Sequence, residues 1–370
     1  MDDVGLAGLA AASALGRGTE AQLAGALAGS SAFAPVQRFD VGGRRVRLAA
    51  TLPDAGSLAD ELAAAIDEAC RHAGLSEVDR SGTLLMLAVH GYPDAPRVSG
   101  RPAAAELAAE LVLRAGLGAV QRVYTSACVS ASTAVSDAVA LIRLGRAERI
   151  VVAAGYLVES DQFALFDAGR TLATDGAVRP FSSGRSGFLL GDAVGAVIVE
   201  SVAVTGKRGG EVLARVVGWG RAGDAYHACQ PHPQGLGMAR AIGSALRRAG
   251  IEPAEIGYLN AHGAGTSFSD VAESAGLHRA LGAAVADVPV SSTKAVHGHT
   301  LEASGLIELV ITVLALRSGK LPVNVGYLGP DPDCELNLIL SAPRQLRTDY
   351  AVSVNAAFGG ANTALVVRAA

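Results

Sequence analysis

A duplicated pattern of secondary structure runs along this chain of 370 residues. Segment 192–201 (DAVGAVIVES) can be laid over segment 360–369 (GANTALVVRA), an offset of 168 residues, obtained as 360 minus 192. In both segments small residues lead into an apolar strand. The apolar pattern breaks at TGKRGG, near residue 205. The sequence therefore predicts two duplicated halves, domains 1–205 and 206–370.

Strands and helices alternate within the first half. An amphipathic helix with apolar residues at three- and four-residue spacing begins at Leu58 and stops at Gly74. A second helix pattern runs over 129–144 and stops at Gly145. The predicted strands of this half lie at 82–89, 119–124 and 149–155. Such alternation predicts an α/β fold in which helices cover both faces of a parallel sheet.

Composition excludes several classes of protein. The chain has 31 Lys and Arg against 35 Asp and Glu, a net charge of −4, which argues against a surface that binds nucleic acid. Half of the residues are hydrophobic and only 18% are charged, which is enough apolar material for a large core and too much for a disordered chain.

The sequence also bears on compartment and metal content. Asp2 and Asp3 stand where a secretory signal needs positive charge, and the apolar run Leu306–Leu316 is short and interrupted by Glu308, as in a buried helix. No CxxC pair occurs, so neither a disulfide framework nor a zinc site is expected. We expect a cytoplasmic protein without a membrane span. The four cysteines are Cys70, Cys128, Cys229 and Cys334.

Cys128 lies in TSACVSAS, between a predicted strand and the first turn of a predicted helix. Free N–H groups and the helix dipole at that place favour a thiolate, as a nucleophilic cysteine requires. The alternative is a small hydrophobic residue packed beneath the helix, the usual role of a free cysteine. The duplication offset carries Cys128 to position 296, close to His299, so both halves would present a reactive residue at a helix start.

Two histidines are candidate functional residues of the second half. His262 (NAHGAGTSFSD) follows an apolar strand, and the glycines after it permit a tight turn that exposes the imidazole at the carboxyl end of the strand. His299 (STKAVHGHTLEASG) opens a helix, where an imidazole is pushed toward its neutral form and can donate one N–H to a developing oxyanion. His297 is a rival for this role. Lys294 precedes His299 by five residues, among side chains that argue against full exposure.

Taken in order, these motifs resemble the elongating β-ketoacyl-[acyl carrier protein] synthases, the ketosynthase branch of the thiolase superfamily. The resemblance runs nearly from end to end. Cys, His, Lys and His at ordered spacing carry most of it. The matching segments are VGLAGLAAASALG for the opening strand, TSACVSAS for the nucleophile, RPFSSGRSGFLLGDAVGAVIVE for the hairpin, NAHGAGTSFSDVAE and STKAVHGH for the histidine motifs, and NAAFGGAN for the gating loop.

The resemblance implies a chemical role for each matched residue. Cys128 would accept an acyl chain from a carrier thioester. His262 and His299 would hold the enolate formed when malonyl thioester loses carbon dioxide. Lys294, with Glu273, would organise this pair of histidines.

It also implies an oxyanion hole, a fold and partners. The N–H groups of Cys128 and Phe358 would stabilise the oxyanion of acyl transfer, with Phe358 and Gly359 in the gating loop and Asp270 in support. The expected fold is thiolase-like, with two duplicated βαβαβαββ halves stacked as an α/β/α/β/α sandwich. The expected partners are an acyl carrier protein, whose phosphopantetheine carries the substrates so that no cofactor is needed, and a second ketosynthase-like subunit in a homodimer or heterodimer.

Some segments depart from the family pattern. GEGA becomes Gly191, Asp192, Ala193, Val194, and HGTGT becomes HGAGT. The stretch between residue 89 and Cys128 is abridged, since a short proline-containing loop leads directly into AAAELAAELVLRAGLG. In the family a longer segment covers the entrance and helps to pair subunits. Pocket depth, acyl length and dimer geometry are therefore the properties that transfer least.

Other functions remain open at this level. A catalytically silent partner subunit would lack Cys128, and a thiolase would have a second cysteine where Phe358 and Gly359 stand. A non-elongating acyltransferase would use Cys128 but form an ester or an amide. Arg143, Arg146 and Arg149 form a basic group that either receives an acidic carrier protein or is a solvated helix end.

Overall fold

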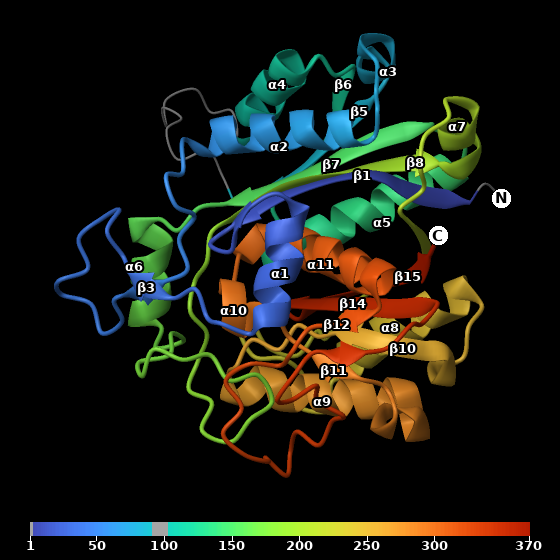
Figure 1. Cartoon of the computed structure of the whole chain (residues 1–370). Coiled ribbons are helices and arrows are strands. Elements are labelled where there is room, and N and C mark those ends of the chain that lie inside the picture. The colour runs from blue at the N-terminus through green and yellow to red at the C-terminus, as the bar shows by residue number, and fades with distance from the viewer. Residues whose placement is uncertain (1–2, 91–102) are drawn as a thin grey trace.

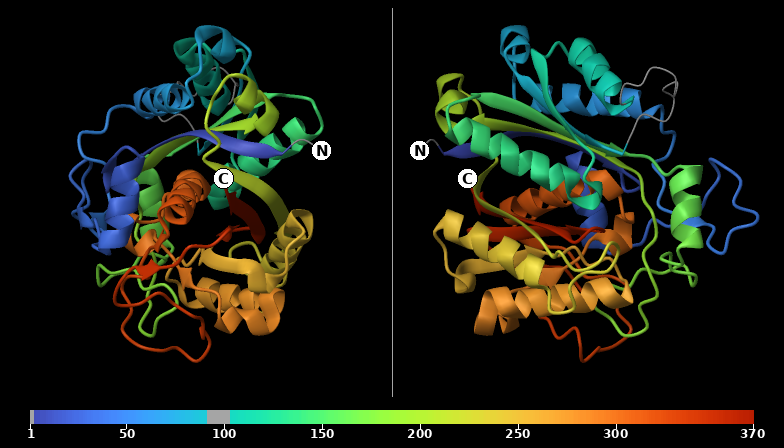
Figure 2. Two further views of the ribbon diagram at one scale, coloured as in Figure 1. Left: turned by 45° about the vertical axis from the view of Figure 1, so that its right-hand side comes forward. Right: turned by 180° about the vertical axis from the view of Figure 1, so that it is seen from behind.

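The computed structural model describes residues 3–90 and 103–370 and has five layers (Figure 1). Two helices lie in the middle, α5 (Ser130–Arg143) and α11 (Ser304–Ser318), with a layer of strands on either side of them. The view from behind shows α5 between the two strand layers (Figure 2). The outer layers contain α2 (Leu58–His72), α3 (Glu77–Ser81) and α4 (Ala103–Ala115) on one side, and α8 (Leu236–Ala249) and α9 (Ser267–Leu281) on the other.

The two strand layers repeat one topology. The first contains, in spatial order, β6 (Ala119–Tyr124), β5 (Leu84–Val89), β7 (Arg149–Tyr156), β8 (Ala193–Ser201) and β1 (Val4–Ser13). The second contains β11 (Val290–Ser291), β10 (Ile256–Asn260), β14 (Tyr350–Ala357), β15 (Ala361–Ala369) and β9 (Ala214–Gly223). Each strand of one layer has its counterpart at the same place in the other, in space and along the chain. The duplicated fold is thereby confirmed.

The layers join where β1 pairs with β9, through Gly5 opposite Arg215 and Leu6 opposite Ala214. In the described residues the strands therefore form one continuous sheet of eleven, which includes the short β2 (Gly16–Arg17) beside β1. The boundary at residue 205 stays a prediction, and that residue lies inside the short helix α7 (Val202–Lys207).

The remaining elements are short. They are α1 (Thr19–Ala28), α6 (Ser160–Ala168), α10 (Lys294–His297), the pair β3 (Ala34–Pro35) and β4 (Leu48–Ala49), the pair β12 (Lys320–Leu321) and β13 (Arg344–Gln345), and the 3₁₀ turns η1 (Ala127–Val129), η2 (Pro253–Glu255), η3 (Gly282–Ala286) and η4 (Leu301–Ala303).

The expectation of a parallel sheet is wrong for part of each layer. β5 is parallel to both β6 and β7, but β8 is antiparallel to both β7 and β1. An antiparallel neighbour arises when a connection returns to the end of the sheet that it left. Segment 157–192 does so, since Tyr156 lies opposite Ala193. The connection therefore stays at the carboxyl end of β7.

The offset along the chain between the two central helices differs from the offset between the equivalent strands. β8 and β15 begin at Ala193 and Ala361, 168 residues apart, as predicted. Helices α5 and α11 begin at Ser130 and Ser304, 174 residues apart, because the distance along the chain from the start of the central helix to the start of the last strand is six residues longer in the first half. The counterpart of Cys128 is therefore Glu302, the middle residue of η4, and the prediction of position 296 is wrong.

Helix α11 is buried along almost its whole length, which confirms that the apolar run at Leu306–Leu316 is a core helix. Within residues 3–90 and 103–370, no helix has the length and apolar character that a bilayer crossing requires.

Candidate active site

Cys128 lies in a strained turn between β6 and α5. Ala127, just before it, has φ 50°, a left-handed conformation that is unfavourable for a residue with a β-carbon. Leu301, at the equivalent place in the second half, has φ 43°. The two turns, η1 and η4, pack against each other. The Cys128 side chain keeps part of its surface accessible, as an acceptor of an incoming group requires.

The surroundings of Cys128 hold the sulfur as a thiol. Burial raises the pKa of Cys128 to about 12, and the Glu302 carboxylate adds to this effect. Lys294 and a backbone hydrogen bond lower the pKa by less than burial raises it. The expectation of a thiolate is therefore wrong for the free protein, because burial outweighs the opposing effects of Lys294 and the backbone hydrogen bond.

His262 is held through its own backbone. It lies two residues after the end of β10, and its backbone N–H donates to Glu273 Oε1 at 2.7 Å, while the backbone N–H of Gly263 donates to Oε2 at 2.7 Å. The carbonyl oxygen of His262 accepts from Lys294 Nζ at 2.6 Å. The side chains of His262, Glu273 and Lys294 are all buried. Gly263 has φ 39°, and this turn of the backbone is the one that the glycines were predicted to permit.

His299 is fixed in orientation and in tautomer. The backbone N–H of His299 donates to the carbonyl oxygen of Leu189 at 2.7 Å, in the segment that connects β7 to β8. Its Nδ1 accepts from the N–H of Leu301 at 3.2 Å and lies 3.2 Å from Ser304 Oγ. A backbone N–H can only donate, so Nδ1 carries the lone pair and Nε2 carries the proton. His299 is therefore a hydrogen-bond donor through Nε2.

The two imidazoles form one neutral unit. Their ring centroids lie 5.4 Å apart in an edge-to-face arrangement. Burial holds the pKa of both His262 and His299 well below the usual value, and the positive charge of Lys294 lowers it further. Two neutral imidazoles side by side can donate hydrogen bonds to one developing negative oxygen without charge repulsion between them.

His297 has a different role. Its Nε2 lies 2.8 Å from Thr293 Oγ1 and its Nδ1 lies 2.8 Å from Gly298 O, so both ring nitrogens are engaged within its own loop. Burial lowers its pKa to about 3. The geometry favours His299 over His297 as the partner of His262.

Lys294 forms a buried ion pair that the sequence reasoning missed. Its Nζ lies 2.5 Å from Glu308 Oε1 in α11, and both side chains are fully buried. Asn355 Nδ2 donates to Glu308 Oε2 at 2.6 Å. The contact partner of Lys294 is thus Glu308, whereas Glu273 bonds the backbone of His262. The signal was present, because Glu308 is the one charged residue in the apolar run 306–316.

The two acidic residues of α9 that were predicted as supports are buried beneath the His262 loop. Asp270 accepts the N–H of Phe181 at 2.8 Å and that of Gly265 at 3.0 Å. Burial raises the pKa of Asp270 to about 6 and that of Glu273 to about 8, against the opposing effect of the backbone N–H donors.

The predicted gating loop is the turn between β14 and β15. Phe358 is half exposed, with its ring centroid 6.4 Å from that of Phe166 in α6. Gly359 and Gly360 have φ 84° and 75°, as a tight turn with left-handed residues requires. The N–H of Gly359 donates to Ala228 O at 2.7 Å. The roles of Phe358 and Gly359 as oxyanion donor and gate stay predictions.

Most of the predicted basic group has other partners. Arg143 donates to the carbonyl oxygens of Val216 and Val217 and lies over the Trp219 ring. Arg149 is buried and bonds Glu200. A surface for a carrier protein therefore does not follow from these arginines.

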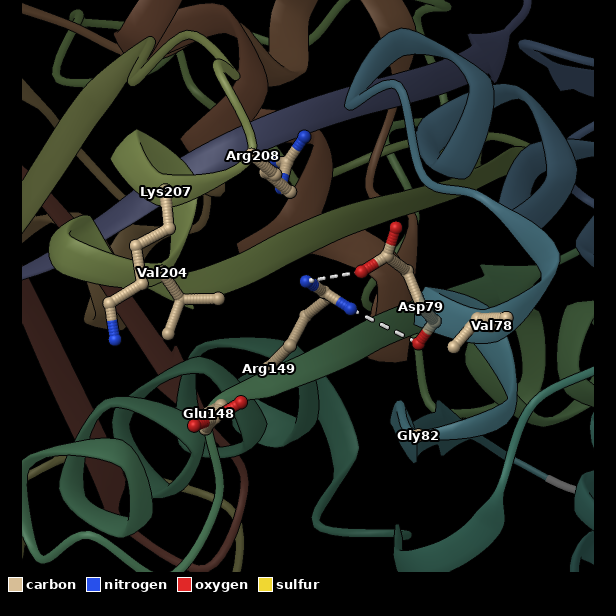
Figure 3. Close-up of a pocket in the computed structure, with 8 residues that line it drawn as sticks. All are labelled: Val78, Asp79, Gly82, Glu148, Arg149, Val204, Lys207 and Arg208. Carbon is tan, nitrogen blue, oxygen red and sulfur yellow. Dashed lines mark hydrogen bonds and ion pairs between the residues drawn. The ribbon is translucent and has the colours of Figure 1, made fainter.

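A pocket of about 320 Å³ at the start of β7 is lined by charged side chains, several of which form ion pairs (Figure 3). Arg149 bonds Asp79 and Glu200, and Arg208 bonds Glu200, whose carboxylate is fully buried. The catalytic candidates lie at the opposite end of β7. Among the described residues, no three His, Cys, Asp or Glu side chains are grouped to hold a metal ion. The prediction that no cofactor is needed is untested.

The chain is similar to proteins of one family. The model of the beta-ketoacyl synthase N-terminal domain matches residues 46–204, and the model of the C-terminal domain matches residues 213–327. The 3-oxoacyl-[acyl-carrier-protein] synthase 2 of Staphylococcus aureus is 35% identical over 248 residues, 66% of this chain. This alignment spans 62% of the length of that relative.

Solved structures match over the whole chain. The ishigamide ketosynthase/chain length factor is 26% identical, with a TM-score of 0.92 over 100% of this chain and 99% of its own. A beta-ketoacyl synthase from Burkholderia phymatum STM815 is also 26% identical, with a TM-score of 0.91 over 100% of both chains. These similarities confirm the thiolase-like fold inferred from the sequence motifs.

Proposed function

Because the chain belongs to the β-ketoacyl synthase family, we propose that it joins an acyl group to a malonyl group carried by an acyl carrier protein, with loss of carbon dioxide. The product is a 3-oxoacyl carrier protein, made in fatty-acid or type II polyketide assembly. The S. aureus relative is named for such a synthase, which supports this reaction class.

The observation that carries the proposal is the pair of buried, neutral imidazoles in the second half, whose neighbour Lys294 also acts electrostatically on the Cys128 thiol of the first half. His299 presents Nε2–H because Leu301 occupies Nδ1. His262 Nδ1 has no partner among the described residues, which leaves this ring free to settle its tautomer on the substrate. Decarboxylation of a malonyl thioester places negative charge on one oxygen, and two uncharged donors suit that need.

The first step loads the acyl group. The sulfur of Cys128 attacks the carbonyl carbon of an acyl thioester, a new carbon–sulfur bond forms, and the carrier thiolate leaves with the proton of the Cys128 thiol. Because burial raises the pKa of Cys128 to about 12, this proton must move during the attack rather than before it. The N–H groups of Cys128 and Phe358 are the proposed donors to the transient oxyanion.

The second step makes the carbon–carbon bond. The bond between the malonyl carboxylate and its α-carbon breaks, carbon dioxide leaves, and the electron pair passes to the thioester oxygen, which His262 and His299 hold. The enolate carbon then attacks the acyl carbonyl carbon on Cys128. The tetrahedral intermediate collapses and expels the Cys128 sulfur as thiolate, which takes up a proton from solvent.

Lys294 and Glu273 would act as positioning residues. Lys294 donates to the carbonyl oxygen of His262, and Glu273 accepts from its backbone N–H, so the two side chains fix the backbone of His262 on both sides of its α-carbon. Glu308 balances the charge of Lys294. A fixed donor direction is the condition under which preorganised hydrogen bonds lower a barrier.

The partners, compartment and cofactor use belong to the same proposal. We propose an acyl carrier protein as donor of both substrates, a homodimer or a heterodimer with a ketosynthase-like subunit, a cytoplasmic location and no cofactor. The similarity to a ketosynthase/chain length factor supports a ketosynthase-like partner.

Intact mass spectrometry tests the proposal. Acyl carrier thioesters are expected to leave an acyl adduct on Cys128, and malonyl carrier protein is then expected to give a 3-oxoacyl carrier product with release of carbon dioxide. Cys128→Ala should lose the adduct but keep some malonyl decarboxylation, because the histidine pair does not need the thiol. An adduct that persists on Cys128→Ala, or an ester or amide product in place of the 3-oxoacyl thioester, would overturn the assignment.

A further inference from the structure

Two buried polar side chains near Cys128 each keep an atom without a partner. Glu302 is 2% exposed, and its Oε1 lies 3.0 Å from His90 Nδ1. Its Oε2 has no hydrogen-bond partner among residues 3–90 and 103–370. Tyr156 is also 2% exposed, and its hydroxyl has no partner in the same part of the chain. Buried polar atoms are nearly always paired, so each of these needs an explanation.

Both side chains belong to the surroundings of the nucleophile. Glu302 is the counterpart of Cys128 in the duplicated fold, and their turns, η4 and η1, pack together. Strand β7 also packs against η4. Tyr156 is the last residue of β7 and shares a face with Val152 and Ala154. That face belongs to the core between the strand layers, against which Cys128 packs.

The charges agree with this placement. The Glu302 carboxylate is the largest contribution after burial to the raised pKa of Cys128. Burial raises the pKa of the Tyr156 phenol well above its usual value, with smaller contributions from Asp192, Glu159 and Glu302. Glu302 therefore acts electrostatically on both the thiol and the phenol.

His90 orients the carboxylate. It occupies Oε1 from the outside, with its own ring more than half exposed, and leaves Oε2 as the open acceptor. The phenol of Tyr156 is a donor and an acceptor, while the carboxylate can only accept. A group that both donates and accepts, such as an alcohol, matches the two open atoms together. An alkyl chain matches neither.

We propose that Glu302 and Tyr156 determine acyl specificity, and that the acyl group on Cys128 carries a hydroxyl that donates to Glu302 Oε2 and accepts from the Tyr156 hydroxyl. This inference rests on the proposed function, because it needs an acyl group on Cys128. The preference over an alkyl chain of equal length arises because that chain would displace water from the two polar atoms and replace none of its hydrogen bonds.

Competitive loading tests the proposal. The full chain is incubated with equal amounts of hexanoyl carrier protein and one of its hydroxyhexanoyl isomers at a time, and early adducts are counted by intact mass. At least one isomer is expected to load about tenfold faster than hexanoyl, the ratio that corresponds to about 1.4 kcal/mol. Hexanoyl loading as fast as every isomer overturns the inference and leaves the proposed function standing. No adduct from any substrate overturns the proposed function itself.

Two variants assign the preference to these residues. Glu302→Gln and Tyr156→Phe should each bring the ratio of hydroxylated to plain adduct toward one. Tyr124→Phe is the matched control, since Tyr124 is a buried tyrosine of the same core whose hydroxyl already bonds Asp137 at 2.9 Å. This control should keep the full ratio. An unchanged ratio in both test variants would overturn the assignment, even if the wild-type protein prefers a hydroxylated chain.

Discussion

Single side chains in this site take their protonation states mainly from burial. Burial keeps His262 and His299 neutral and keeps Cys128 protonated, because it disfavours the charged form of each group. In the proposed mechanism the neutral imidazoles are the hydrogen-bond donors that the enolate needs. The neutral thiol, in contrast, must lose its proton for the sulfur to form a thioester. In the proposed mechanism the site would therefore be ready for enolate formation, while Cys128 would become reactive only as its proton departs.

The reactivity of Cys128 should show this state directly. Below its pKa of about 12, the thiolate fraction rises about tenfold with each pH unit. The rate of alkylation by iodoacetamide at Cys128 should therefore keep rising through pH 10, as measured by peptide mass spectrometry. Exposed Cys229 serves as an internal check on the reagent. Glu302→Gln should raise the rate, because it removes a negative charge near the sulfur. A plateau near pH 8 would mean that the thiol is activated in the free protein.

His299→Ala should separate the two chemical steps. The loss of one preorganised donor is expected to slow carbon dioxide release about 100- to 1,000-fold. Acyl loading should fall much less, because His299 does not hold the acyl oxyanion in the proposed mechanism. Radiolabelled malonyl carrier protein measures the first rate and intact mass the second.

His297→Ala is the control for this prediction. Its side chain bonds Thr293 and the carbonyl of Gly298, so its removal should lower the melting temperature more than it lowers carbon dioxide release per folded molecule. Equal losses of both steps in His299→Ala, or a larger decarboxylation defect in His297→Ala, would contradict the assignment.

Motif order predicted the residues of the candidate site, but it could not give all of their contacts. Cys128, His262, Lys294 and His299 are recognisable because each has a distinctive chemical group in a distinctive local sequence. Glu308 was missed because its partner lies 14 residues away and on a different helix. The pKa direction of Cys128 was wrong because a helix start is visible in the sequence, whereas burial depends on the whole fold.

Among the elements, helix α9 carries the support for the His262 loop. Its Glu273 has a pKa raised to about 8, above the ordinary value of 4.5, so the folded state binds this proton more tightly than the unfolded state does. The stability that this group contributes is present at low pH and is lost as pH rises from about 4.5 to about 8. The helix is thus fixed to the loop by a group whose charge changes near neutrality.

Glu273→Gln should reveal that dependence. A glutamine has one acceptor oxygen for the N–H groups of His262 and Gly263, and an unsatisfied buried donor costs about 1–3 kcal/mol. Urea denaturation at pH 5 to 8 should show a less stable variant whose deficit relative to the wild-type protein shrinks as pH rises. A deficit that grows with pH would indicate a pKa below the ordinary value.

The close approach of the segment just before β8 to the His299 loop gives a second prediction at this level. A β-carbon on Gly191 would lie 2.0 Å from the carbonyl oxygen of His297. Gly191→Ala should therefore displace that loop, with a stability loss of about 1–3 kcal/mol and slower carbon dioxide release. Gly206→Ala in α7 meets no atom within 4 Å and should be neutral or stabilising. Thermal unfolding of both variants makes the comparison, and a Gly191→Ala protein as stable as Gly206→Ala would contradict it.

Most helices and strands were predictable because their signals are local. The strand at 119–124 was placed as observed, and the helix at 129–144 appears as a 3₁₀ turn followed by α5. The direction of β8 was not predictable, since it depends on where a connection of 36 residues, 157–192, returns. The proline-containing loop at 91–102 lies outside the described residues.

In the whole molecule, the site is assembled from both halves. Cys128 comes from the first half, and both histidines and Lys294 come from the second. Helices α5 and α11 fill the space between the strand layers, so their apolar side chains belong to one shared core. The internal duplication was visible in the sequence, but this interdependence was not, because an offset between similar segments says nothing about which surfaces face each other.

The shared core predicts a single unfolding transition. Differential scanning calorimetry should give one peak whose calorimetric and van't Hoff enthalpies agree. Fragments 1–205 and 206–370, produced separately, should show no cooperative melt, because each would expose the apolar faces that now meet between the layers. Two resolved transitions in the intact chain, or a fragment that melts cooperatively, would show that the halves are independent.

The matching turns at Cys128 and Glu302 bear on the number of acyl groups that one chain could hold covalently. The backbone bends alike in the two halves, yet a sulfur stands at one bend and a carboxylate at the other. A carboxylate cannot be used here as a second tether for a thioester-borne chain. In the proposed mechanism each polypeptide would therefore hold one acyl group at a time.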